Sequence, residues 1–130
     1  YKKIDGRKLR PIIPITLGYK GKEVTFYALI DSGADINLFP AVLLDSLGIN
    51  LHDGIPGTVG GITADEAQTF YFHTLKLNIG EHSFKTQVAF METLPDTGHG
   101  LLGQKGFFDK FAVKFDYRNK EIEVTEHGKY

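Results

Sequence analysis

Short runs of apolar and β-branched residues recur along the chain at close intervals, as the strands of a sheet protein do. The runs lie at residues 12–17, 24–30, 70–79, 84–90, 111–117 and 121–126. Part of the run at 70–79 alternates with a period of two, which places neighbouring side chains on opposite faces of a strand. Turn-forming residues separate the runs at 18–21, 80–81 and 117–120. The pattern predicts a mainly β domain.

Two segments carry the pattern of short helices. Residues 40–48 begin with a proline, contain three leucines and end with a glycine, and proline at the start and glycine at the end are typical of a helix. Residues 103–111 are a second candidate. No linker, repeat or low-complexity stretch divides the sequence, so we expect a single domain over residues 1–130.

Length and charge limit the classes of protein that need to be considered. At 130 residues, the chain has the size of one domain and can bury roughly two-thirds of its unfolded surface. The 15 basic residues nearly balance the 16 acidic ones, so no overall field attracts nucleic acid or a membrane surface, and neither is expected as a partner. No apolar run approaches the ~20 residues of a membrane span. The first ten residues are locally basic, which fits either a solvated arm or an interaction tail.

The chain contains no cysteine, which excludes thiol chemistry and cysteine-ligated metal. The same absence favours a reducing compartment such as the cytoplasm. The sequence begins at Tyr1 and its only methionine is Met91, so we expect it to be a piece of a longer polypeptide. Its five histidines do not have the spacing of metal ligands, so no metal site is expected. No other cofactor is expected either.

One acidic residue ends a run that otherwise reads as a buried strand. Residues 27–30 (YALI) are followed directly by Asp31, Ser32 and Gly33, and these three residue types are common in tight turns. The chain re-enters apolar surroundings at residues 38–39, however, and a carboxylate in such a place is costly unless it is paired or hydrogen-bonded. Costs of this kind gather at functional sites, so Asp31 is a candidate catalytic residue.

Residues 28–34 resemble the catalytic signature of aspartic proteases, in which apolar residues precede Asp, Ser or Thr, Gly and Ala. Residues 100–103 (GLLG) resemble the apolar-apolar-Gly motif that crosses beneath the catalytic loop in that family, and residues 107–108 fit the helix that follows it. Residues 57–62 (GTVGGI) resemble the glycine-rich tip of a flap hairpin. The three stretches stand in the family's order and are far more specific together than any one alone.

Length selects the subclass that the resemblance implies. Pepsin-like enzymes carry two lobes in one chain, whereas a chain of this size resembles the single-lobe retroviral-type proteases, or retropepsins. The implied fold is a closed, barrel-like β domain with a flap hairpin and one or two short helices, and the implied assembly is a homodimer. The tail at 111–130 is longer than viral members carry, and residues 115–124 predict an additional hairpin there, which leaves the dimer interface open.

The resemblance also implies a mechanism, namely hydrolysis of peptide bonds by general acid-base catalysis in an aspartic endopeptidase. Two Asp31 side chains, one from each subunit, would share a proton and hold a water between them. Ser32 would link the two catalytic loops, and Gly33 would let the substrate backbone approach. The substrate would be an extended peptide or a polyprotein segment, lying as a strand between flap and floor. Its implied contacts are Ala34, Asp35, Val59, Gly60, Gly61, Ile62 and Leu102.

Other interpretations of these motifs are weaker. A second D-T-G, at residues 96–98, follows a proline and has no second GLLG downstream, so it is interpreted as a turn. GLLGQKG lacks the spacing and the Lys-Ser/Thr pair of a phosphate-binding loop, and Ser32 lacks the context of a nucleophilic serine. The alternative function is a catalytically silent dimerisation or peptide-binding module that kept the fold. The intact motif at 31–34 and the flap glycines favour the enzyme.

Overall fold

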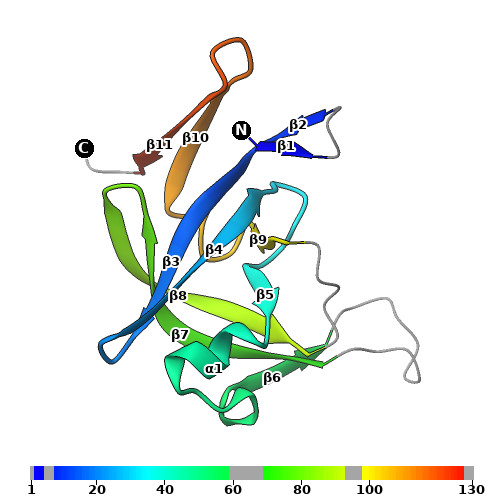
Figure 1. Cartoon of the computed structure of the whole chain (residues 1–130), viewed down its shortest axis with the longest axis vertical. Helices are drawn as coiled ribbons and strands as arrows, with labels where there is room; N and C mark the ends of the chain where they lie inside the picture. Colours follow the sequence, from blue (N-terminus) through cyan, green and yellow to red (C-terminus); the bar gives the residue numbers. More distant parts are fainter. Residues whose placement is uncertain (1, 5–7, 59–68, 93–97, 128–130) are drawn as a thin grey trace.

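The computed structural model describes residues 2–4, 8–58, 69–92 and 98–127 of the chain (Figure 1). A short helix α1 (Leu43–Leu47) and a single 3₁₀ turn η1 (Leu51–Asp53) stand among strands. The strands are β1 (Lys2–Ile4), β2 (Lys8–Arg10), β3 (Ile12–Tyr19), β4 (Lys22–Ile30), β5 (Leu38–Pro40), β6 (Ile55–Thr58), β7 (Thr69–Ile79), β8 (His82–Met91), β9 (Gly100–Leu102), β10 (Phe111–Asp116) and β11 (Glu121–Glu126). The mainly β class predicted from the pattern is confirmed.

The main sheet closes on itself. Its strand order is β3-β4-β9-β5-β8-β7-β6, and β3 also pairs with β7, so the strands from β3 to β7 in this order form a closed barrel with β6 outside it. The pairs β4–β9 and β5–β8 are parallel, and the other pairs of this sheet are antiparallel. No helix in the described residues is long and apolar enough to span a membrane.

The hairpin between β3 and β4 shows how local sequence sets the register. Tyr19 pairs with Lys22, so the loop contains only Lys20 and Gly21, whose φ angles are 48° and 83°. Two consecutive positive φ values give the turn whose twist matches that of the flanking strands. The turn fixes the pairing that brings Leu29 opposite Ile12 at the far end of the hairpin.

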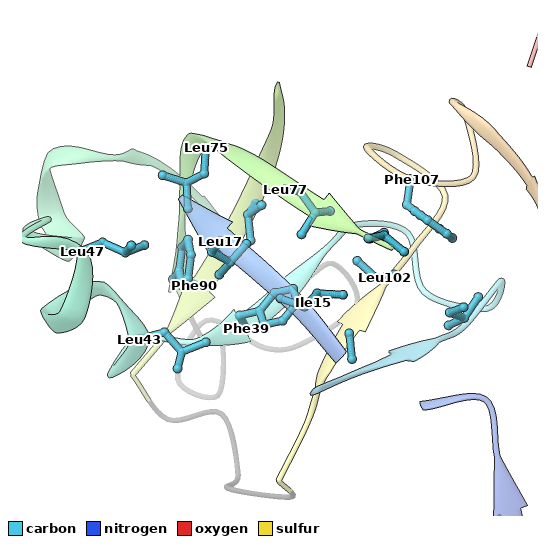
Figure 2. Packing of buried hydrophobic residues seen from close by; sticks show 14 of the residues in the cluster. Ile15, Leu17, Phe39, Leu43, Leu47, Leu75, Leu77, Phe90, Leu102 and Phe107 are labelled. Carbon is cyan, nitrogen blue, oxygen red and sulfur yellow. The ribbon is translucent and has the colours of Figure 1, made fainter. Parts of the chain in front are cut away.

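The barrel encloses the main hydrophobic core (Figure 2). Both the barrel strands and helix α1 contribute side chains to this core. Leu17, Phe39, Phe90 and Leu102 are completely buried. Burial of a side chain of this size stabilises a fold by about 1.5–3 kcal/mol relative to exposure. α1 covers one end of this core with its three buried leucines.

A second apolar cluster lies on the other face of β8. Val88 and Phe90 belong to the main core, whereas the alternate residues Ala89 and Met91 pack in a separate group with Phe70. Ile36, Leu38 and Phe72 lie partly buried against this group. We call these six residues the outer cluster (Ile36, Leu38, Phe70, Phe72, Ala89 and Met91). Its members come from the segment that leads into β5, from β5 itself, and from β7 and β8.

The predicted C-terminal hairpin is confirmed: β10 and β11 pair in antiparallel fashion from Phe111↔Glu126 to Asp116↔Glu121. This two-stranded sheet packs against the barrel, and two of its contacts are specific. The ring nitrogen Nε2 of His82 lies 3.0 Å from the carbonyl oxygen of Val124, and the ring of Phe111 packs on that of Phe84 at 4.8 Å between centroids.

The two helices predicted from the sequence fare differently. Helix α1 is confirmed but short, because Pro40 is the last residue of β5 instead of the first of the helix. Residues 103–111 do not form a helix, and the prediction there is wrong. The amides of Phe108 and Asp109 bond to carbonyls five positions back in the chain, and Gly106 has a φ of +100°. This segment is therefore a series of turns.

Candidate active site

Asp31 lies directly after β4, at the point where the parallel pair β4–β9 ends. Its amide donates to the carbonyl oxygen of Leu102 at 3.0 Å, which extends the ladder by one bond. The chain then turns sharply, since the amide of Ala34 donates to the Asp31 carbonyl at 3.0 Å. Inside the turn, the Gly33 amide donates to the Asp31 carboxylate oxygen Oδ1 at 2.9 Å. The half-buried carboxylate is thereby held in one orientation.

The segment that follows β9 fastens the rest of this loop, which we call the Asp31 loop (residues 31–37). The Gln104 side chain donates from Nε2 to the Ser32 carbonyl at 2.7 Å. The Gln104 amide donates to the Ala34 carbonyl at 2.9 Å, and the Lys105 amide to the Asp35 carbonyl at 2.9 Å. These bonds run along the loop one after another and leave its backbone little freedom next to Asp31.

Gly103 allows this close approach. A Cβ atom built on Gly103 would lie 2.5 Å from the Ile36 carbonyl oxygen and 2.6 Å from that of Ala34. Both neighbours are backbone atoms of the Asp31 loop, which a side-chain rotation cannot move away. The glycine that ends the GLLG motif is therefore required by contact with the loop and not by its own backbone conformation.

Asn37 is the buried anchor of the loop, with only 1% of its surface exposed. Its Oδ1 accepts from the Gly103 amide at 3.1 Å, and its Nδ2 donates to the Gln87 carbonyl at 3.3 Å. Its own carbonyl accepts from the Ala89 amide at 2.8 Å. Since buried polar groups are costly when unpaired, these bonds fix the end of the Asp31 loop against both β8 and the GLLG strand.

Apolar side chains flank the loop. Leu101 is opposite Leu29 in the β4–β9 pair and opposite Leu38 in the β5–β9 pair, so the three lie in one row across three strands. They are half-buried, in contrast to Ile30 and Leu102, which point into the core. Leu38 also belongs to the outer cluster. A continuous apolar floor therefore runs from the neighbourhood of Asp31 to β7 and β8.

The predicted site residues have three different outcomes. Residues 31–35 lie together in the Asp31 loop, with Ser32, Gly33 and Asp35 exposed. Leu102, expected to contact substrate, has a completely buried side chain, so that expectation is wrong. The alternation of β9 turns Leu102 into the core and leaves Leu101 at the surface, while Leu102 serves the site through its carbonyl. The expected flap contacts, Val59, Gly60, Gly61 and Ile62, lie outside the described residues, as does most of the second D-T-G.

Two residues that support the loop were missed in the sequence. Asn37 carried a signal, because a polar residue between Ile36 and Leu38 interrupts an apolar run. Gln104 carried none beyond its position directly after the GLLG motif.

The described residues hold no group of three or more His, Asp or Glu side chains arranged to bind a metal. A cavity of about 760 Å³ lies beside α1, lined among others by Val42, Asp45 and His52, and not by Asp31. It is therefore separate from the Asp31 loop.

Comparison with known proteins agrees with this geometry. A family model described as aspartyl protease matches residues 13–105. The fold is similar to that of EIAV protease complexed with the inhibitor HBY-793, with a TM-score of 0.52 and 16% identity over 79% of this chain and 88% of that one. It is also similar to a retropepsin-like aspartic protease from Rickettsia conorii, with a TM-score of 0.51 and 18% identity over 91% of this chain and 94% of that one. No curated protein sequence matches significantly. The predicted retropepsin-like fold is confirmed.

Proposed function

This chain belongs to the aspartyl protease family, and from that premise we propose that it is a homodimeric aspartic endopeptidase with Asp31 as its catalytic residue. The observation that carries the proposal is the Asp31 loop itself. A carboxylate stands at the end of a core strand. The Gly33 amide donates to this carboxylate, and the backbone amide of Asp31 donates to the Leu102 carbonyl. The remainder of its loop is bound to the segment after β9.

One chain contributes one such aspartate, so the complete site needs a second copy. Two Asp31 carboxylates brought together across a two-fold axis cannot both ionise easily, and the pair keeps one proton between them, as aspartic proteases in general do. The exposure of Ser32 and Gly33 beside Asp31 supports this arrangement, because both residues are accessible to a partner.

The shared proton makes both halves of the reaction possible. The ionised carboxylate takes a proton from the bound water as the water oxygen attacks the peptide carbonyl carbon. The protonated carboxyl group gives its proton to the carbonyl oxygen, which forms a tetrahedral diol. When the C–N bond breaks, the protonated carboxyl group gives its proton to the leaving amine nitrogen and the ionised carboxylate takes a proton from a diol hydroxyl, so the pair again holds one proton.

The surroundings of Asp31 support an extended peptide with apolar side chains at the cleavage point. The floor formed by Leu29, Leu38 and Leu101 offers apolar contact next to the carboxylate. Ala34 and Asp35 would contact the substrate backbone from the loop, and Val59, Gly60, Gly61 and Ile62 would cover it as a flap. These contacts are part of the proposal.

The test is cleavage of a mixed peptide library from pH 4 to 7 by the wild type, Asp31→Asn and Asp96→Asn, each at several protein concentrations. We expect the wild type and Asp96→Asn to cleave, with activity rising more than linearly with concentration, and Asp31→Asn to be silent. Equal loss in both variants would refute the assignment of Asp31 alone. A folded, dimeric wild type without activity would favour the silent binding module.

A further inference from the structure

Two adjoining hollows lie on the outer surface of β7 and β8. One, of about 310 Å³, is lined by the apolar residues Ile36 and Phe72 and by three lysines, among other residues. The second, of about 460 Å³, shares Thr74 and Lys85 with the first and extends to the β3–β4 turn. We call this continuous surface the lysine groove. Its basic residues are Lys20, Lys22, Lys76, Lys85, Lys105 and Lys110.

The lysine groove begins at the candidate active site. Ile36 is part of the Asp31 loop and of the outer cluster, and Phe72 belongs to that same cluster. Ile36 also forms a parallel bridge with Lys105, so a groove lysine stands directly beside the loop. A peptide that leaves the apolar floor in this direction enters the groove.

The positive charge of the groove is not balanced locally. Only two carboxylates, Glu23 and Asp109, line it, and Asp109 accepts a hydrogen bond from the Gly106 amide at 3.1 Å. Lys76 and Lys85 are exposed and directly opposite each other in the β7–β8 register, a placement of like charges that destabilises a sheet. Between residues that the structure describes, the close contact of a basic with an acidic side chain lies elsewhere, at 3.7 Å between His52 and Glu92.

The imbalance is a property of this surface and not of the protein. The whole chain has a formal net charge of −1, whereas six lysines and two carboxylates give the groove a formal excess of four positive charges. A ligand of complementary charge would relieve the repulsion between Lys76 and Lys85.

We propose that the lysine groove binds an acidic stretch of the peptide substrate, several residues to one side of the scissile bond. This inference rests on the proposed protease function. The continuity with the apolar floor favours a peptide, because one ligand must place apolar side chains near Asp31 and carboxylates near Lys85, Lys105 and Lys110. Each exposed ammonium–carboxylate contact changes affinity by about 1.5- to 5-fold, so three contacts give about tenfold.

The test uses peptides that share one cleavable apolar core, taken from the library above. One set carries three Glu residues on the N-terminal side of the core, a second carries them on the C-terminal side, and each has a Gln-matched partner. kcat and KM are measured at about 50 mM and about 500 mM NaCl, since salt screens exposed charges. The proteins are the wild type, a groove variant and a control variant, all checked for folding by circular dichroism.

The groove variant is Lys85→Gln/Lys105→Gln/Lys110→Gln. The control is Lys114→Gln/Arg118→Gln/Lys120→Gln, which removes the same charge from the C-terminal hairpin. Binding of fluorescent Glu and Gln peptides to Asp31→Asn is measured in parallel, so that recognition is read without cleavage.

We expect one Glu peptide to have a KM about tenfold lower than its Gln partner, with the difference lost in the groove variant and at high salt and kept in the control. Cleavage without a preference for Glu, or a preference that survives in the groove variant, would overturn the inference and leave the protease intact. Glu-selective binding without any cleavage would reject the protease and keep the groove. Stronger competition by a single-stranded oligonucleotide than by the Glu peptide would overturn the assignment of a peptide.

Discussion

Replacing Asn37 by aspartate keeps the shape of the side chain and makes its chemistry depend on pH. Oδ1 of Asn37 accepts from the Gly103 amide and Nδ2 donates to the Gln87 carbonyl. A protonated carboxyl group can do both, because its hydroxyl donates and its other oxygen accepts. An ionised one has no donor for Gln87 and places a negative charge in a position that is 1% exposed.

The size of the effect follows from burial. Full burial raises the pKa of a carboxyl group by up to about 3–5 units. The single bond from Gly103 favours the charged form, so we take a net rise of about 2–3 units, which corresponds to about 3–4 kcal/mol at 1.4 kcal/mol per unit. Because the folded pKa is raised above the unfolded one, the penalty is absent below the unfolded pKa. It grows as the pH rises and levels off above the folded pKa.

Urea unfolding between pH 4 and 7, followed by circular dichroism, measures this penalty. Relative to the wild type at the same pH, we expect Asn37→Asp to lose less than about 1 kcal/mol at pH 4 and about 3–4 kcal/mol at pH 7. Asn50→Asp is the matched control. Oδ1 of Asn50 only accepts a bond, from the His52 amide at 3.0 Å, on an exposed side chain, and aspartate serves equally well in that position.

A loss of stability that is the same at every pH would refute the reasoning, because it would mean that the introduced carboxyl group stays in one protonation state. An equal pH dependence in Asn50→Asp would refute it as well, since the effect would then come from net charge and not from burial.

Two further predictions concern single hydrogen bonds. The substitution Gln104→Met removes the bond that this exposed side chain donates to the Ser32 carbonyl. We expect the melting temperature to change little and kcat to fall about tenfold with KM nearly constant. An unchanged kcat would exclude a positioning role for Gln104. The Asn119 amide and side chain both donate to Asp116 and hold the pKa of its carboxyl group below the usual range. Asn119→Ala removes the side-chain bond, so the pKa of Asp116, measured by carbon-detected NMR, should rise. The stability that the ionised Asp116 contributes is lost as the pH falls through the folded pKa, and this contribution should become smaller in the variant. An unchanged pKa would contradict the prediction.

The sequence was most informative where structure depends on neighbouring residues. The sequence predicts the long strands β3, β4, β7 and β8, because alternation and turn chemistry are local properties. β5 has only three residues, and its identity as a strand depends on pairing with β8 and β9, far away in the chain. The same limit explains the wrong helix at 103–111, where the backbone bonds to the distant Asp31 loop and Gly106 has a positive φ.

Leu102 shows a second limit. The GLLG motif marked the segment that forms β9, but a shift of one residue exchanges the two faces of a strand. No local feature determines whether Leu101 or Leu102 points to the core. The Phe39 ring lies against Gly100, where a Cβ atom would be. Since Gly100 and Leu102 share one face of β9, this contact marks that face as the buried one. Which of the two leucines lies at the surface could be decided only after that contact was known.

The distribution of buried polar groups connects the fold with the proposed site. Among the described residues, the buried polar side chains are Asn37 and Thr86. Both bond to the segment after β9, Asn37 to the Gly103 amide and Thr86 to the Gly106 carbonyl at 2.8 Å. Such bonds are directional, so they fix a geometry where apolar packing alone would tolerate small shifts. Their placement behind the Asp31 loop gives a rigid support for a carboxylate at an otherwise exposed turn. The homodimeric site that we propose would require such a support in each half.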